Sequence, residues 1–420
     1  MAEEKTGAPQ SGTILVVGGG ISGITTALEA AEVGYEVFIV EKNPYLGGRV
    51  AQLNKYFPKL CPPTCGLEIN FQRIKKNNLV KWFTLTEVEK ISGGPGNYDV
   101  ALKQTPRYVN NNCTCCGKCA DACDVQIPNT FNFGMDKRKA AYLPHEMAFP
   151  QRYVLDPSII GTSAAQKCKD ACPYNAIDLD EKPKTFNIKV ASIVWATGWN
   201  PYDATKMTNL SFGKVQNLIT NMMMERLAAV NGPTNGKIVR PSDGKVVNNI
   251  AFVQCAGSRD ENHLPFCSYI CCLASLKQTT YIREANPESK ATIFYIDLRT
   301  PGRYEKFYKK VKADANVSFV KGKVAKIEED PATKDVIVTV EDTLSGNKIH
   351  ASFDMVVLAT GMEPSTAQVK VPGNAQYDDN NFVISGDILA TGCVKKPSDV
   401  MSSGQTATGT ALKAIQMVRR

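Results

Sequence analysis

The chain has 420 residues, 43% of them hydrophobic and 21% charged, which is enough for two or three well-packed domains. Its formal net charge is +8, but the cations are spread along the chain. This distribution excludes a nucleic-acid-binding protein and is compatible with an acidic partner or an anionic membrane surface. The apolar stretches are of strand length, and the first dozen residues lack a secretory signal. We therefore expect a cytoplasmic protein, and any association with a membrane must come through a partner.

A strand, a glycine-rich turn and a helix follow one another near the N-terminus. The apolar stretch 13–17 predicts a buried parallel strand that runs into the motif G-x-G-x-x-G. In this motif Gly18 permits the tight turn, and Gly20 lets the backbone approach a pyrophosphate. Gly23 lets the helix and the strand pack closely. The order of these parts predicts a dinucleotide-binding fold.

The next elements complete this fold. A helix over 24–33 is preceded by Ile21 and Ser22, whose backbone amides can bind the phosphates. A second strand over 36–40 ends at Glu41, which is placed to accept hydrogen bonds from a ribose.

Four later features favour FAD over a nicotinamide cofactor. Gly48 and Arg49 follow the second strand. Two apolar strands, at 192–198 and 354–361, both end in Ala-Thr-Gly. A further strand over 381–387 ends in Gly-Asp, and a helix over 402–418 follows it. Together they resemble flavoproteins of the glutathione and thioredoxin reductase type, which have two dinucleotide-binding domains. That resemblance implies that Asp387 binds the ribityl chain or the pyrophosphate, and that the last helix points its N-terminus at the flavin. The residues expected to contact FAD are Gly18, Gly20, Ile21, Ser22, Gly23, Glu41, Lys42, Gly48, Arg49, Ala196, Thr197, Gly198, Gly361, Gly386 and Asp387.

The second dinucleotide domain of that type normally holds NADPH with its own glycine motif. Here the matching strand, 249–254, opens into Cys255 rather than into glycines, although strands over 291–297, 317–324 and 335–341 follow. Four thiols stand in place of the cradle, namely Cys255, Cys267, Cys271 and Cys272. Four thiols this close suit thiolate ligation of a metal centre, and the doublet Cys271-Cys272 is unusual for zinc, although zinc or a redox dithiol stays open.

A ferredoxin-like segment, 107–182, interrupts the FAD domain. It contains the run C-x2-C-x2-C-x3-C at positions 113, 116, 119 and 123, which is typical of bacterial ferredoxins. In the partner run, Cys168 and Cys172-Pro173 are present, but Thr162 and Ala165 replace two cysteines. The economical assignment is one [4Fe–4S] cluster on Cys113, Cys116, Cys119 and Cys172. Ligation by Cys123 in place of Cys172 stays open.

Three further cysteines have no clear assignment from sequence. Cys61 and Cys65 form a C-x3-C pair that could be redox-active, could ligate a cluster or could be structural, and Cys393 is expected to be structural. With only three histidines and no catalytic triad or carboxylate pair, the chemistry is expected to reside in the cofactors.

The flavin scaffold, the ferredoxin insertion and the cysteine set together resemble the A-type subunits of heterodisulfide reductases over nearly the whole chain. The resemblance implies an α/β fold with two dinucleotide domains and an inserted iron–sulfur segment, FAD and two [4Fe–4S] clusters. The expected segments are a flexible tail (1–12), the first FAD segment (13–106), the ferredoxin-like insertion (107–182), the return strand and linker (183–248), a degenerate nucleotide-binding-like domain carrying a cluster (249–361) and the final FAD segment (362–420).

Within this family the chain is most similar to the short subunits of quinone-interacting membrane-bound oxidoreductases from sulfate-reducing bacteria. That implies an oxidoreductase subunit that passes menaquinol electrons toward adenylylsulfate reductase. Its partners would be a second A-like flavoprotein and a haem-bearing membrane subunit, and the flavin could merge two electron streams. The alternatives are the A-type subunit of a soluble flavin-bifurcating heterodisulfide reductase-type complex, a free-standing NAD(P)H-dependent flavin reductase, and a non-catalytic assembly subunit.

Overall fold

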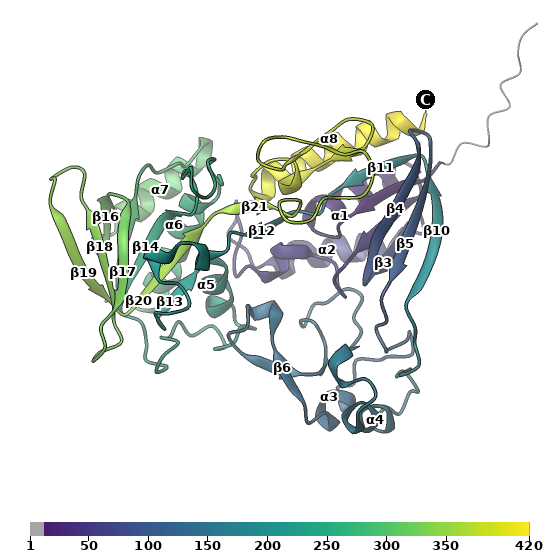
Figure 1. Ribbon diagram of the computed structural model, residues 1–420, viewed down its shortest axis with the longest axis horizontal. Helices are drawn as coiled ribbons and strands as arrows, with labels where there is room; N and C mark the ends of the chain where they lie inside the picture. The colour runs from purple at the N-terminus through teal and green to yellow at the C-terminus, as the bar shows by residue number, and fades with distance from the viewer. Residues whose placement is uncertain (1–11, 420) are drawn as a thin grey trace, which may run out of the picture.

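The computed structural model describes residues 12–419, so the tail expected at 1–12 lies outside the described residues except for Gly12. Figure 1 shows two α/β lobes joined by the strands β12 (Trp199–Pro201) and β21 (Met362–Pro364), with a smaller insertion beside them. These two strands pair antiparallel, so the chain crosses between the lobes twice at the same place.

The first lobe contains a five-stranded parallel sheet in the order β24-β11-β1-β2-β3. The strands are β1 (Ile14–Val17), β2 (Val37–Glu41), β3 (Val80–Thr84), β11 (Ser192–Trp195) and β24 (Leu389–Ala390). One face carries α1 (Ile21–Glu32), α2 (Pro63–Lys76) and α8 (Val400–Val418), and the other carries a meander of β4 (Thr86–Gly94), β5 (Asn97–Gln104) and β10 (Lys184–Val190). Because both faces are covered, every residue of β1 is buried.

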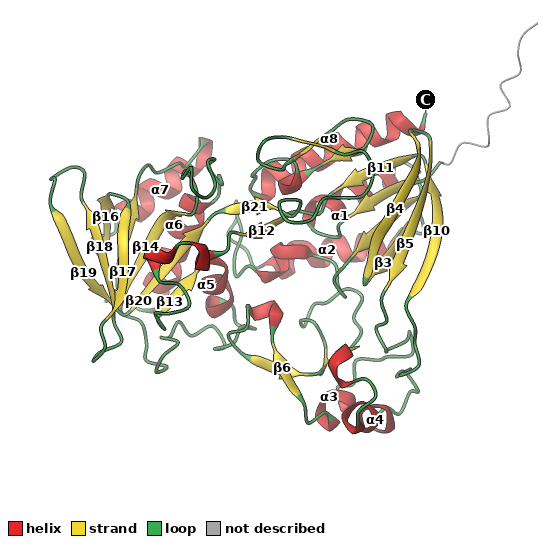
Figure 2. Ribbon diagram, viewed as in Figure 1, coloured by secondary structure: helices red, strands yellow, loops and turns green. Residues whose placement is uncertain are grey.

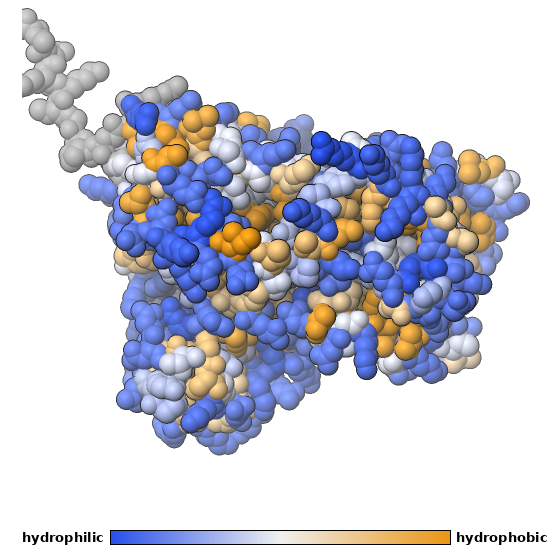
Figure 3. Space-filling view, turned by 180° about the vertical axis from the view of Figure 1, so that it is seen from behind, coloured by the Kyte–Doolittle hydropathy of each residue, from blue (hydrophilic) through white to orange (hydrophobic). Residues whose placement is uncertain are grey.

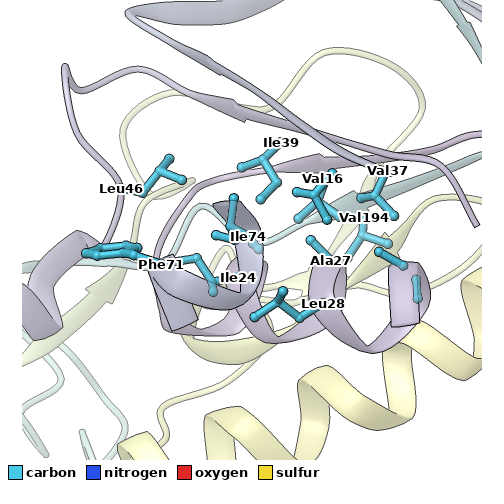
Figure 4. Packing of buried hydrophobic residues seen from close by; sticks show 14 of the residues in the cluster. Val16, Ile24, Ala27, Leu28, Val37, Ile39, Leu46, Phe71, Ile74 and Val194 are labelled. Atoms are coloured by element: carbon cyan, nitrogen blue, oxygen red, sulfur yellow. The ribbon is translucent and has the colours of Figure 1, made fainter. Parts of the chain in front are cut away.

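Helix α1 is held on the sheet by its apolar side. Figure 4 shows Ile24 and Leu28 of α1 facing Val16 and Val194 of the central strands, and all four side chains are fully buried. Full burial of such side chains stabilises the fold by about 1.5–3 kcal/mol each. This packing fixes the start of α1 at the carboxyl end of β1, where the glycine turn lies.

The second lobe repeats the same plan (Figure 2). Its parallel sheet has the order β13-β20-β14-β15-β16, with β13 (Leu218–Thr220), β14 (Asn249–Ala256), β15 (Lys290–Tyr295), β16 (Val317–Lys321) and β20 (Met355–Thr360). Around it lie α5 (Asn221–Ala228), α6 (Cys271–Ala285) and α7 (Glu305–Lys312), and a meander of β17 (Val324–Glu329), β18 (Val336–Glu341) and β19 (Lys348–Phe353). The fold is therefore an α/β flavoprotein fold with two dinucleotide-binding-type domains.

The insertion consists of short elements around its own small core. They are α3 (Lys118–Ala122), β6 (Gln126–Pro128), β7 (Lys137–Lys139), β8 (Ala141–Tyr142), β9 (Val154–Leu155) and α4 (Ser163–Asp170). Buried cysteines and alanines make up much of this core, because large apolar residues are few here.

Several predicted strands are shorter in the structure. The strand expected over 192–198 is β11, which ends at Trp195 before Ala-Thr-Gly, and the strand expected over 291–297 is β15, which ends at Tyr295. The strand expected over 317–324 ends at Lys321, since Gly322 passes so close to β18 that a Cβ would lie 2.1 Å from the carbonyl oxygen of Glu341. The strand expected over 381–387 is only β23 (Val383–Ile384), which pairs with β22 (Gln376–Tyr377). The strand that joins the FAD sheet is β24, after a turn in which the Gly386 amide donates to Ile388.

The last helix begins two residues earlier than expected. Asp399 is its N-cap and accepts from the Ser402 amide at 2.7 Å, which satisfies one free N–H of the first turn. Within 12–419, none of the helices combines the length and the apolar character that a membrane span requires.

Candidate functional site

One large cavity of about 880 Å³ starts at the glycine turn of the first lobe and extends to α6 of the second. Its volume is in the range of cofactor sites. Most residues predicted to contact FAD line it: Gly18, Gly20, Ile21, Ser22, Glu41, Lys42, Gly48, Arg49, Ala196, Thr197 and Gly198. Gly23, Gly361, Gly386 and Asp387 do not.

The glycine turn has the shape that a pyrophosphate cradle needs. Gly18 has φ +110°, and a Cβ on it would lie 2.3 Å from the carbonyl oxygen of Ala196. A Cβ on Gly23 would lie 1.8 Å from the oxygen of Gly18, so only glycine lets α1 pack on β1 here. At Gly20 the nearest atom would be 3.9 Å away, which leaves the backbone open to the cavity. The cradle therefore fits a dinucleotide.

Glu41 holds this turn in place. Its carboxylate accepts from the Gly19 amide at 2.7 Å and from the Asn43 amide at 2.8 Å. Burial raises the pKa of Glu41, and these two backbone hydrogen bonds oppose the rise. The side chain also borders the cavity, so it keeps the position predicted for a ribose acceptor.

Arg49 ties the cavity to the linker between the lobes. Its Nε donates to the carbonyl of Trp199 at 2.6 Å, and Nη2 donates to Asn200 Oδ1 at 2.8 Å. The guanidinium also lies over the Trp199 ring, 5.3 Å from its centre. Burial lowers the pKa of Arg49, but it stays cationic, so the cavity carries one fixed positive charge at this point.

The C-terminal contribution to the cavity is displaced from the predicted one. Asp387 is exposed, and its backbone carbonyl accepts from the Tyr98 hydroxyl at 3.1 Å. The cavity instead meets Ser398, Asp399 and Ser403, at the start of α8. The expectation that the last helix directs its N-terminus at the flavin site agrees with this placement. Gly386 and Asp387 do not line the cavity because they precede β24, the strand that joins the sheet of the first lobe.

One further residue predicted to contact FAD, Gly361, also lies outside the cavity lining. Gly361 lies among the serines Ser258 and Ser268, where a Cβ would be 2.5 Å from Ser258 Oγ, away from the cavity. Cys393, expected to be structural, is buried and hydrogen-bonds to the carbonyl of Ser398. Cys393 also lines the cavity.

The second lobe contributes a wall of buried polar side chains that sequence reasoning missed. Glu225 of α5 and Lys277 of α6 form an ion pair at 3.1 Å, with side chains only 2% and 5% exposed. Glu225 also accepts from Gln278 at 2.7 Å and from the Tyr281 hydroxyl at 3.1 Å. No sequence motif marks these residues, since they are ordinary polar positions until the two helices meet. The pair places a compensated charge at the cavity wall.

The cysteine set of the second lobe lies next to this wall. Cys271 and Cys272 begin α6, Cys255 lies near the end of β14, and Cys267 is in the loop between them. Burial, and then its neighbours Cys272, Cys255 and Cys267, raise the pKa of Cys271, so the other three thiols lie near Cys271. Ile270, the N-cap of α6, and Leu273 line the cavity, so the cavity reaches the residues that flank Cys271 and Cys272 in the chain.

The arrangement suits thiolates and leaves no phosphate cradle. Burial raises the pKa of Cys255, and Arg259, which hydrogen-bonds to it, opposes the rise. The Tyr269 amide donates to Cys267 Sγ at 3.4 Å, and N–H···S bonds of this kind are what iron–sulfur sites use. Gly257, the glycine nearest the strand, cannot take part in an open turn, because a Cβ there would lie 2.5 Å from the ring of Tyr202.

The four cysteines assigned to the insertion also come together. Cys113, Cys116, Cys119 and Cys172 line one small cavity between α3 and the segment after α4. Burial, and then Cys113, raise the pKa of Cys119 to about 12, with smaller effects of Cys172 and Cys116. The Ala176 amide donates to Cys172 Sγ at 3.4 Å. This geometry favours Cys172 over Cys123 as the fourth ligand.

Cys123 faces another thiol. It is fully buried beside Cys168, and burial, followed by Cys123, raises the pKa of Cys168 to about 12. Helix α4 runs through the positions that a second cluster-binding loop would need, with Ala165 fully buried. Elsewhere in the molecule, Cys61 is half-buried and Cys65 is exposed near the start of α2.

No three His, Cys, Asp or Glu side chains among residues 12–419 converge tightly enough to hold a single metal ion. A [4Fe–4S] cluster is larger than a single ion and spreads its four thiolate ligands around itself. Both cysteine sets offer four thiols and N–H donors to sulfur, which is the donor chemistry that such a cluster requires. The residues therefore fit FAD at the cavity and a cluster at each set.

Comparison with known proteins is consistent with this geometry. Residues 13–61 match the family model for FAD dependent oxidoreductases. The chain is 38% identical to the A-type iron–sulfur subunit, form 2, of the CoB–CoM heterodisulfide reductase of Methanopyrus kandleri, over 95% of this chain and 63% of that protein. It is 33% identical to the A-type subunit of the H2:CoB–CoM heterodisulfide, ferredoxin reductase of Methanothermobacter thermautotrophicus, over 96% and 64%. The chain thus spans less than two thirds of these curated relatives.

Solved structures agree on the fold. The thioredoxin reductases of T. acidophilum and Lactococcus lactis both superpose with a TM-score of 0.52, at 14% and 12% identity and over 97% of this chain and 98–99% of theirs. At such identity the likeness concerns the fold alone. Over nearly its whole length the chain is thus similar to the A-type subunits of heterodisulfide reductases, and its first segment matches an FAD dependent oxidoreductase.

Proposed function

We propose that the chain is the FAD- and iron–sulfur-containing electron-transfer subunit of a heterodisulfide reductase-type complex. The observation that carries this proposal is the single cavity, which joins the glycine turn of the first lobe to the helix start that bears Cys271 and Cys272. A flavin held there would lie next to thiolate-bound iron instead of a nicotinamide. Bound FAD supplies the exchange between two-electron and one-electron transfer.

The residues of this chain would then have distinct tasks. Gly18 and Gly20 bind the pyrophosphate, Glu41 accepts from the ribose, and the start of α8 directs its free N–H groups into the cavity. The ion pair of Lys277 and Glu225 closes the cavity on the side of the second lobe and excludes water from it. The set of Cys255, Cys267, Cys271 and Cys272 holds one cluster, and the insertion set holds the other.

The names of the relatives support a disulfide-reducing complex better than the quinone-linked role expected from the sequence. Splitting or merging of two electron streams at the flavin is compatible with either role. Affinity purification of the tagged chain from its own cells separates the two roles. Partners with heterodisulfide reductase activity in the soluble fraction support the first, and a haem-bearing membrane partner together with menaquinol-dependent reduction supports the second.

The proposal is tested by flavin, iron and sulfide analysis of anaerobically purified protein, with EPR of the reduced form. We expect one FAD and about eight iron atoms per chain, and no reduction of the flavin by NADPH. Cys272→Ser should remove about four iron atoms and keep FAD, whereas Cys168→Ser, outside both sets, should remove none. Rapid bleaching of the flavin by NADPH, or an unchanged iron content in Cys272→Ser, would contradict the proposal.

A further inference from the structure

A strongly basic segment begins at the cysteine set of the second lobe. Residues 299–312 contain six cations and a single carboxylate, Glu305. All six cations are exposed, namely Arg299, Arg303, Lys306, Lys309, Lys310 and Lys312. The backbone of Arg299 hydrogen-bonds to Cys272, so the segment starts in direct contact with the thiols. The charge therefore lies beside a proposed cluster and not at a random place on the surface.

Most of this charge is not neutralised within the molecule. Lys309 pairs with Glu305 at 3.0 Å, and both side chains are exposed. No carboxylate among residues 12–419 lies within ion-pair distance of Arg299, Arg303, Lys306 or Lys310. Figure 3, which views the molecule from behind, shows strongly hydrophilic side chains gathered over the region of α7.

The same segment also reaches the mouth of the flavin cavity. The inner side of α7 packs through Phe307 against Phe57, with ring centres 5.3 Å apart, and Phe57 lines the cavity. Within the cysteine set Cys267 is partly exposed, and Tyr269, two residues further along the chain, is 36% exposed. A partner seated here would therefore approach both the mouth of the flavin cavity and the cysteine set of the second lobe.

We propose that residues 299–312, together with the exposed edge at Cys267 and Tyr269, form the docking surface for an acidic electron-carrier protein. The proposal rests on the proposed function, because it takes the cysteine set to be the site that exchanges electrons. Unpaired surface cations around such a site steer an acidic partner toward it and raise the association rate, and they select against basic carriers.

The test measures electron transfer from a reduced, acidic two-cluster bacterial ferredoxin to the oxidised, full-length protein by stopped-flow spectroscopy. We expect the second-order rate constant to fall at least about tenfold between low salt and about 0.5 M salt, since the attraction is screened. A triple variant, Arg303→Glu, Lys306→Glu and Lys310→Glu, should lower the rate at low salt by a similar factor.

A matched variant separates local from overall charge. Lys90→Glu, Lys184→Glu and Lys348→Glu reverse three other exposed lysines, so the net charge is the same, yet the rate should stay within about twofold of the original. Equal effects of the two triple variants, or a rate independent of salt, would overturn the proposal. Binding to phosphatidylserine vesicles that only the first variant loses, with an unchanged ferredoxin rate, would assign the surface to a membrane and also overturn it.

Failure of the proposed function is recognised separately. If iron analysis shows no cluster at Cys255, Cys267, Cys271 and Cys272, the function proposed above fails. Calorimetric binding of the same ferredoxin still tests the surface in that case, because docking does not depend on electron transfer. Loss of binding in the first triple variant alone supports the docking surface, and equal binding by all three proteins overturns it.

Discussion

Removal of one partner from the buried ion pair between Lys277 and Glu225 is expected to destabilise the protein strongly. Glu225→Gln leaves the Lys277 ammonium with the carbonyl of Lys55, to which it donates, and with the ring of Tyr281 at 5.8 Å. Neither neighbour carries a negative charge. Lys277→Met leaves the Glu225 carboxylate with three donors, from Gln278, the Tyr281 hydroxyl and a backbone amide. The cost should therefore be larger for Glu225→Gln.

The magnitude follows from the geometry. Two unit charges 3.1 Å apart attract by about 5 kcal/mol at an effective dielectric constant of about 20. Removing one partner of a buried pair typically costs about 3–5 kcal/mol, because the other charge stays buried. We expect about 4 kcal/mol for Glu225→Gln and about 2–3 kcal/mol for Lys277→Met. The double variant should cost about 2 kcal/mol less than the sum of the single ones.

The measurement is a double-mutant cycle on the FAD-free protein, so that cofactor release does not enter the unfolding transition. Urea unfolding followed by circular dichroism gives the four free energies, and equal slopes show that the same transition is compared. Lys55→Met serves as the control, because its ion pair with Glu284 is exposed and should contribute less than about 1 kcal/mol. Strictly additive costs at Lys277 and Glu225 would refute the reasoning.

Three further outcomes are expected. Gly18→Ala should reduce FAD affinity at least tenfold in a flavin titration, because the new Cβ would lie 2.3 Å from a backbone carbonyl oxygen. Gly404→Ala is the control, since a Cβ at this position would have no atom within 4 Å, and it should leave the titration unchanged. Cys172→Ala should lose about four iron atoms per chain and Cys123→Ala none, and the reverse result would move the fourth ligand to Cys123. Burial, and then a neighbouring arginine, lower the pKa of His145 to about 4. As the pH falls from about 6.5 to 4, His145 binds a proton in the unfolded state before it does so in the folded state. The free energy of unfolding should therefore drop by up to about 3 kcal/mol over this pH range. Urea unfolding at several pH values should show a smaller drop for His145→Phe.

Local rules explain why the first lobe could be predicted well from its sequence. The strand, the glycine turn and the helix lie within one short stretch, and their packing depends on Gly18 and Gly23 having no Cβ. Strand β1 has four apolar residues in a row because both its faces are covered. The glycine turn and the apolar strand can be recognised in the sequence because each depends on residues that are neighbours along the chain.

The C-terminal part shows where local signals mislead. The apolar stretch before Asp387 looked like the last strand of the FAD sheet, but that stretch forms a separate hairpin, and the sheet strand follows it at Leu389–Ala390. A two-residue strand has too little pattern to be recognised. Which segment enters the sheet is decided by pairing with β11, nearly 200 residues earlier in the chain.

By itself, the sequence determined the presence of one glycine cradle, two cysteine sets and a second domain without a cradle, because spacing along the chain encodes each of them. Only the tertiary structure decided that the cavity extends from that cradle to the start of α6, that Cys172 and not Cys123 lies in the small cavity with Cys113, Cys116 and Cys119, and that Lys277 meets Glu225. Each of these facts depends on contacts between segments far apart in the chain, and such contacts leave no period or motif in either segment alone.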